Sequence, residues 1–151
     1  MALDAAHALW VVEDSDEDME ALRFALRQVG MTLLVEHCRT GREALARLRA
    51  ALGGAAGAAP KPALLLLDLN LPGLHGRDVL AAIRADVQLQ VLPVVVWTTS
   101  AHPGDVAFCY RHGVNGYLLK PVNFDRFQEI VRYFVAYWFE AALLPTSVEG
   151  L

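Results

Sequence analysis

The residues of this 151-residue chain best suited to chemistry are carboxylates that follow apolar runs. Asp68 comes directly after residues 63–67, and Glu13 and Asp14 open a stretch of five acids in six residues after the run 8–12. A carboxylate at the end of a buried strand is costly without a compensating partner. Like charges gathered in one place repel unless they are protonated or bridged by a cation. Magnesium prefers oxygen ligands, so these acids predict a Mg²⁺ site.

Polar residues also follow two other apolar runs. Thr98 and Ser100 come after residues 93–97, and Lys120 comes after residues 116–119. In an open parallel α/β sheet, ligands collect beyond the carboxyl ends of the strands. Carboxylates, a hydroxyl and an ammonium group at one edge would form a site for a metal ion and a transferable anion. Phosphoryl is the best candidate, because Mg²⁺ and a lysine together neutralise its oxygens.

Five largely apolar segments are expected to form the strands that position these residues. They are residues 8–12, 33–38, 63–67, 93–97 and 116–119. Runs without polar alternation are typical of a parallel sheet that helices cover on both faces. Helical patterns lie between the strands: one ends before Gly30, one follows a capping box at residues 40–43, two span 77–85 and 105–112, and one runs from Phe124 towards Glu140 after an Asn123 cap. The alternation predicts a doubly wound (βα)5 domain.

Two further stretches of the sequence are expected to have structural roles and no role in chemistry. Asp16, Glu17 and Asp18 open the first predicted helix, and we interpret these acids as favourable neighbours of its macrodipole. Residues 53–62 are rich in alanine, glycine and proline, and they are predicted to form a long loop that is too short to divide domains.

Four motifs, in order and each at a predicted strand end, resemble those of response-regulator receiver domains of two-component signalling. They are Val12-Glu13-Asp14, Asp68-Leu69-Asn70-Leu71-Pro72-Gly73, Val96-Trp97-Thr98-Thr99-Ser100 and Gly116-Tyr117-Leu118-Leu119-Lys120-Pro121. The similarity spans residues 9–138 and implies a flavodoxin-like five-stranded sheet with strand order 2-1-3-4-5. It implies that Asp68 accepts a phosphoryl group and that Lys120 pairs with that group. It further implies that Glu13 and Asp14 hold Mg²⁺ together with Asp68 and the backbone carbonyl of Asn70.

The resemblance also implies a conformational switch. Thr98 would reach towards a phosphorylated Asp68 and draw the loop at 99–104 inwards, and Tyr117 would rotate into the vacated space. A switch of this kind needs only a few kcal/mol between two arrangements. The family further implies a cis peptide bond before Pro121, which an X-Pro bond tolerates at modest cost.

By the same resemblance, the chain is a phosphoacceptor rather than an enzyme. The ionised aspartate would attack a phosphohistidine of a partner, and hydrolysis of the acyl phosphate would reset the switch. The residues two positions beyond the acceptor and the threonine, Asn70 and Ser100, would set the rate of that autodephosphorylation.

Three alternatives stay open at this point. An aspartyl phosphatase of the haloacid-dehalogenase type would carry a second aspartate where this chain has Asn70. A nucleotide-binding flavodoxin-like module would not place the acids of residues 13–18 in its first loop, because they repel phosphate. A receiver that no longer phosphorylates is disfavoured, because the acceptor, the metal-binding acids, the threonine and the lysine are all present.

Composition bounds the other possibilities. The content of 55% hydrophobic and 20% charged residues fits one globular domain that spans residues 1–151. Thirteen basic and seventeen acidic residues give a net charge of −4 without a basic cluster, so we do not expect a nucleic-acid partner.

The two cysteines, Cys38 and Cys109, lie far apart, and the chain start does not resemble a signal peptide. We therefore expect a cytoplasmic protein, and its apolar stretches are too short to cross a membrane.

The last predicted helix carries more apolar surface than one core needs. Its core-facing stripe is predicted to comprise Phe127, Ile130, Val131, Phe134, Val135 and Trp138. Tyr133, Tyr137 and Phe139 fall outside this stripe. We therefore expect this helix and an aromatic extension at residues 139–151 to form a homodimer, with folding of the extension onto its own domain as the alternative.

Within the family, the chain is most similar to stand-alone regulators that pair with phytochrome-type sensor histidine kinases. The grounds are the sequence after Asp68, the Thr98-Thr99-Ser100 run, the long loop at residues 53–62 and the aromatic extension. The resemblance implies a histidine kinase as the phosphoryl donor and an output through protein contacts.

Overall fold

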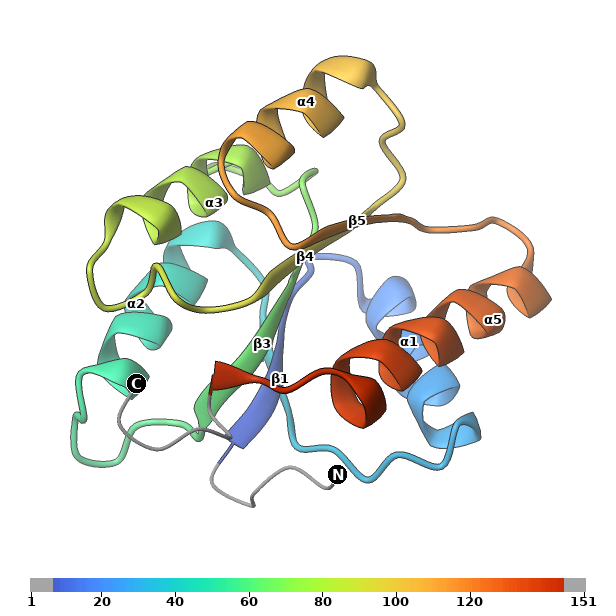
Figure 1. The fold of residues 1–151 in the computed structure, drawn as a ribbon, viewed down its shortest axis with the longest axis horizontal. Coiled ribbons are helices and arrows are strands. Elements are labelled where there is room, and N and C mark those ends of the chain that lie inside the picture. The colour runs from blue at the N-terminus through green and yellow to red at the C-terminus, as the bar shows by residue number, and fades with distance from the viewer. Residues whose placement is uncertain (1–6, 146–151) are drawn as a thin grey trace.

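Five parallel strands form one sheet in the order β2-β1-β3-β4-β5, which confirms the predicted strand order (Figure 1). The computed structural model describes residues 7–145, so positions 146–151 of the predicted extension lie outside the described residues. The strands are β1 (His7–Val12), β2 (Val35–Cys38), β3 (Lys61–Leu67), β4 (Val94–Thr98) and β5 (Gly116–Leu119). Each overlaps the predicted segment, although β2 begins two residues later and β3 two residues earlier.

Helices alternate with the strands and cover both faces of the sheet. They are α1 (Asp16–Gln28), α2 (Gly41–Leu52), α3 (Gly76–Ala85), α4 (Pro103–Arg111) and α5 (Phe124–Val135). The predicted caps are confirmed: the Thr40 side chain accepts a hydrogen bond from the Glu43 amide, and that of Asn123 accepts one from the Arg126 amide. These caps fix where α2 and α5 begin.

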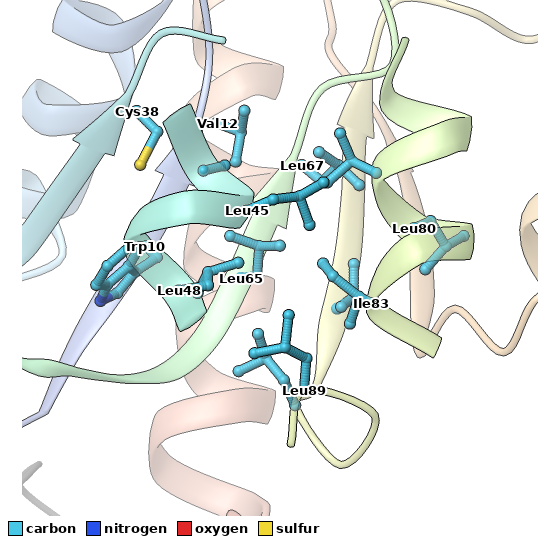
Figure 2. Packing of buried hydrophobic residues seen from close by; sticks show 14 of the residues in the cluster. Trp10, Val12, Cys38, Leu45, Leu48, Leu65, Leu67, Leu80, Ile83 and Leu89 are labelled. Atoms are coloured by element: carbon cyan, nitrogen blue, oxygen red, sulfur yellow. The ribbon is translucent and has the colours of Figure 1, made fainter. Parts of the chain in front are cut away.

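Side chains of each central strand alternate between two hydrophobic cores. Figure 1 shows α1 and α5 together on one face, with α2, α3 and α4 on the other. Trp10 and Val12 of β1 pack under α2 and α3, where Leu48 and Ile83 reach down to the sheet (Figure 2). Leu9 of the same strand points to the opposite core. This alternation is what a strand buried on both faces requires.

The last helix differs from the prediction. The α-helical part ends at Val135, and the chain continues as a π-helical segment, η1 (Ala136–Ala141). A π-helix repeats at i→i+5, and this spacing aligns Phe139 with Phe134, whose ring centroid lies 5.9 Å away. Phe139 is therefore 3% exposed and belongs to the core, so its predicted place outside the stripe is wrong. Tyr137 stays 59% exposed, as predicted.

Candidate functional site

The strand register brings the predicted site residues to one edge of the sheet. Val12 of β1 pairs with Leu67 of β3, so the next residues, Glu13 and Asp68, emerge side by side. The order of strands reverses direction between β1 and β3, and this switch point is where open α/β sheets bind ligands.

Three carboxylates converge at this point. Glu13, Asp14 and Asp68 each offer one oxygen, and these oxygens lie within 4.8 Å of one another. Glu13 is 2% exposed and Asp68 is 7% exposed, whereas Asp14 is open to solvent. This donor set consists only of hard oxygen ligands that are partly buried and have an open side, so it suits a divalent cation such as Mg²⁺.

The backbone around Asp68 is tightly packed. The amide of Asn70 donates a hydrogen bond to Asp68 Oδ1 at 3.2 Å and helps to fix that carboxylate. Gly76, the first residue of α3, approaches so closely that a Cβ there would lie 2.3 Å from the carbonyl oxygen of Asp68. A glycine is therefore required at this contact, and nothing in the sequence around residue 76 indicated it.

Lys120 lies inside the acidic cluster. Thr98 of β4 pairs with Leu119 of β5, so the next residue, Lys120, lies at the same edge of the sheet. The Lys120 amide donates a hydrogen bond to the Thr98 carbonyl. Its ammonium group contacts Glu13 and lies 3.1 Å from Asp68 Oδ2, and its side chain is only 5% exposed. The structure thus brings together the acidic residues and the lysine that the sequence predicted.

The close contacts shift two pKa values. Burial raises the pKa of Glu13 to about 7, and the nearby charge of Asp68 also raises it, while Lys120 and the Ser15 amide oppose the shift. Burial alone would lower the pKa of Lys120, but hydrogen bonds to Glu13 and Asp18 and the charge of Asp68 raise it above its ordinary value. Lys120 is therefore held in its charged form, and the pKa of Glu13 is moved towards neutral pH.

Two contacts of the site were not predicted. Asp18 of α1 lies 2.9 Å from the ammonium nitrogen of Lys120, so its interpretation as a neighbour of the helix dipole alone is incomplete. His37 of β2 places Nε2 2.7 Å from the backbone oxygen of Glu13 and supports the loop that follows β1. The only sequence feature that could have indicated the contact of Asp18 was the run of acids in which it lies. No sequence feature indicated the contact of His37.

A polar network surrounds the loop that follows β4. Thr98 is fully buried, and its Oγ1 accepts a hydrogen bond from the Ser100 amide at 3.3 Å. The Tyr117 hydroxyl donates to the Ser100 carbonyl at 2.7 Å, so this ring already points towards the loop. The Ser100 hydroxyl donates to Asp105 Oδ2 at 2.7 Å, and Arg77 reaches the other oxygen of Asp105 at 3.3 Å.

The peptide bond between Lys120 and Pro121 differs from the expectation. It is trans, as are all peptide bonds in the part of the chain that the structure describes. The trans isomer is the lower-energy form of an X-Pro bond, and Lys120 reaches the acidic cluster in this form. The expected cis peptide is therefore wrong.

A groove of about 300 Å³ opens beside Lys120. It is lined by Asp18, Ala21, Thr99, Lys120, Pro121, Val122, Phe124 and Phe127. The ring of Phe124 lies 5.7 Å from that of Phe24 of α1, and both side chains are partly exposed. Lys120 is therefore bordered by a groove whose lining is partly apolar.

Within residues 7–145, none of the helices has both the length and the apolar character needed to cross a membrane.

Comparisons with known proteins agree with this geometry. Residues 9–132 match the response regulator receiver domain family. Response regulator Rcp1 of Synechocystis sp. is 37% identical over 141 residues, which cover 91% of this chain and 92% of Rcp1. FilR2 of Methanothrix harundinacea, a probable methanogenesis regulatory protein, is 36% identical over 128 residues, which cover 85% of this chain and 81% of FilR2.

Two crystal structures extend the comparison. The phosphorylated cyanobacterial phytochrome response regulator RcpA has a TM-score of 0.82 at 37% identity and covers 92% of this chain and 99% of its own. The Mn²⁺-bound form of Rcp1 has a TM-score of 0.79 at 35% identity and covers 91% of this chain and 97% of its own. The similarity therefore includes the whole sheet and its flanking helices.

Proposed function

Because the chain belongs to the response regulator receiver domain family, we propose that it accepts a phosphoryl group on Asp68 from a sensor histidine kinase. The observation that carries the proposal is the position of Asp68 Oδ2, 3.1 Å from the ammonium nitrogen of Lys120 and within the three-carboxylate cluster. This arrangement places a nucleophilic oxygen beside a fixed positive charge, as in-line transfer to an anionic acceptor requires.

Mg²⁺ is part of the proposal. Glu13, Asp14 and Asp68 would hold the ion together with the backbone carbonyl of Asn70, and the donor set supports this assignment. When bound, the ion would neutralise phosphoryl oxygens and relieve repulsion among the carboxylates. Lys120 supplies the second positive charge, which stabilises the charge that develops on the phosphoryl group as the bond to Asp68 forms.

The switch would operate through the loop after β4. Thr98 would hydrogen-bond to the phosphoryl group through its hydroxyl, which at present accepts from the Ser100 amide. Movement of the loop would act on Tyr117, because its hydroxyl donates to the Ser100 carbonyl. The contact to the phosphoryl group supplies the bias between the two arrangements. We further propose that Asn70 and Ser100, which lie two positions beyond the acceptor and the threonine, control the autodephosphorylation rate.

A phytochrome-type histidine kinase is the donor that we propose. RcpA is a phytochrome response regulator, and this chain covers nearly all of it at 37% identity. The donor would approach along the groove beside Lys120, because this groove lies between α1 and the start of α5 and Lys120 lines it. The exposed rings of Phe24 and Phe124 would then contact the donor protein.

A homodimer through the last helix is the second interaction in the proposal. Tyr133, Tyr137 and Leu143 are exposed, and the two tyrosines line a groove together with residues of the edge strand β5. Phe139 and Leu144 pack on the chain's own core, so they would contribute little to such an interface. Sedimentation as a monomer at tens of micromolar, with and without an acyl-phosphate mimic, would exclude the dimer.

One experiment tests the central proposal and its alternative. The protein is incubated with acetyl phosphate and Mg²⁺, and its intact mass is measured. We expect the addition of one phosphoryl group, which is lost in the Asp68→Asn variant. Turnover of a phosphate ester without a mass change would instead favour an aspartyl phosphatase, although Asn70 occupies the position of that enzyme's acid.

A further inference from the structure

The ammonium group of Lys120 is shared among three carboxylates, and one of them lies outside the acidic cluster. It contacts Glu13, and its nitrogen lies 3.1 Å from Asp68 Oδ2 and 2.9 Å from Asp18 Oδ2. Asp18 is not among the three acids whose oxygens converge for a cation. Its side chain is 42% exposed, whereas that of Lys120 is 5% exposed. Asp18 therefore holds the ammonium group from the solvent side of the site.

We propose that Asp18 is a positioning residue that acts through Lys120 and competes with the phosphoryl group for its ammonium. An ammonium group has three N–H donors, and in this structure three carboxylates surround it. A phosphoryl group on Asp68 adds oxygens that need the same donors. The contact with Asp18 can be given up at the lowest cost, because water can solvate an exposed carboxylate.

The competition acts on the transfer step. A carboxylate oxygen of Asp68 forms a bond to the phosphorus of acetyl phosphate, the bond from phosphorus to the acetyl oxygen breaks, and acetate leaves with the electron pair. Donors of Lys120 that face the phosphoryl oxygens stabilise this step. A donor held by Asp18 is not available to them, and the charge of Asp18 also repels the anionic donor. Asp18 therefore slows the transfer.

The test measures the rate at which acetyl phosphate and Mg²⁺ add a phosphoryl group to the full chain, by intact mass. We expect Asp18→Asn to be faster than the wild type by roughly threefold to tenfold, the effect of one partly exposed charged contact. Glu17→Gln is the matched control, because it removes one negative charge from an exposed position in the same helical turn. It should change the rate less than about twofold. Asp18→Glu, which keeps the carboxylate, should retain the wild-type rate.

The dependence on Lys120 is tested by combining substitutions. In a Lys120→Met background, the gain from Asp18→Asn should fall below about twofold, because no ammonium group remains to be shared. An equal gain in both backgrounds would overturn the proposal and leave a general charge effect. A wild-type rate or a slower rate in Asp18→Asn would overturn it as well. The inference rests on phosphorylation of Asp68, so a wild-type protein that gains no mass overturns both proposals, whereas these results overturn the inference alone.

A second measurement needs neither metal nor phosphoryl donor. In EDTA, Asp18→Asn relieves repulsion from Glu13 and Asp68 but loses the contact with Lys120. In the Lys120→Met background only the relief remains, so the shift in Tm on Asp18→Asn should be more positive there by at least about 2 °C. Equal shifts in the two backgrounds would show that the two side chains do not interact, and would also overturn the proposal.

Discussion

At the residue scale, the site holds more negative charge than its one lysine can balance. The carboxylates of Glu13, Asp18 and Asp68 lie around the ammonium group of Lys120, and that of Asp14 lies beside those of Glu13 and Asp68. Two of them are almost fully buried, where an unbalanced charge is costly. The protein meets this cost in part through protonation, because burial raises the pKa of Glu13 to about 7. A divalent cation would remove the same excess and release that proton.

We therefore predict that the affinity for Mg²⁺ depends on pH. The ion requires the ionised form of Glu13, which is the minor form below its pKa of about 7. Lowering the pH from 8 to 6 should weaken Mg²⁺ binding by about tenfold, because a proton competes with the metal. Titration of Mg²⁺ at several pH values, followed by tryptophan fluorescence, would measure this change.

The control variant is Glu13→Gln, which should bind Mg²⁺ more weakly and with little dependence on pH in this range. A wild-type affinity that is constant between pH 6 and 8 would contradict the role of Glu13.

The same pKa shift affects the stability of the metal-free protein. The folded-state pKa of Glu13 is raised from the ordinary 4.5, so the contribution of this group to the free energy of unfolding is fully present below pH 4.5 and is lost as the pH rises through about 7.

At the element scale, the loop after β4 is held by neighbours that belong to different helices. The Ser100 hydroxyl donates to Asp105 of α4, and Arg77 of α3 contacts the same carboxylate. The Arg77 guanidinium also lies 4.0 Å from the centroid of the Phe108 ring. Each such contact contributes on the order of 1 kcal/mol net. A phosphoryl contact of similar strength can therefore shift this loop.

The π-helical end of the last helix gives a second prediction. Phe139 is buried against Phe134, so Phe139→Ala should lower the free energy of unfolding by about 3 kcal/mol through the lost burial and the cavity left behind. Urea denaturation followed by circular dichroism would measure the change.

Tyr137→Ala is the matched control for that experiment, because Tyr137 lies in the same π-helical segment and is exposed. It is 59% exposed and makes an edge contact with Trp138, so the loss should be less than about 1 kcal/mol. If the two variants were equally destabilised, the π-helical register of this segment would be incorrect.

At the scale of the whole molecule, the sequence predicted the features that follow from the order of strands and helices along the chain. Apolar runs and capping residues indicated five strands and five helices, and parallel strands must deliver their end residues to one edge. The convergence of Asp68 and Lys120 followed from that rule alone. Asp18 did not follow, because the side to which a first-turn acid points depends on how α1 is rotated against the sheet. Phe139 was assigned wrongly, because an α-helical period was applied to a segment that winds as a π-helix.

The position of the groove on the molecule gives the last prediction. The groove beside Lys120 lies between α1 and the start of α5, and the ring of Phe124 stands half exposed at its rim. A small donor such as acetyl phosphate needs only the groove, whereas a kinase domain must also contact the surface around it. Phe124→Ala should therefore slow phosphoryl transfer from the partner kinase at least about tenfold, as expected when a central aromatic contact is removed from an interface. Its rate with acetyl phosphate should change by less than about twofold, because Phe124 does not contribute a charge to the site.

Tyr110→Ala serves as the control, because Tyr110 is an exposed aromatic residue on α4, which covers the opposite face of the sheet (Figure 1). This substitution should leave both rates unchanged. Parallel loss of the two rates in Phe124→Ala would mean that the ring supports the site rather than the kinase contact. If only Tyr110→Ala lost transfer from the kinase, the kinase would instead bind at α4. Since the two aromatic residues are similar in size and exposure but lie on different faces, the pair distinguishes a local docking surface from a general loss of apolar surface.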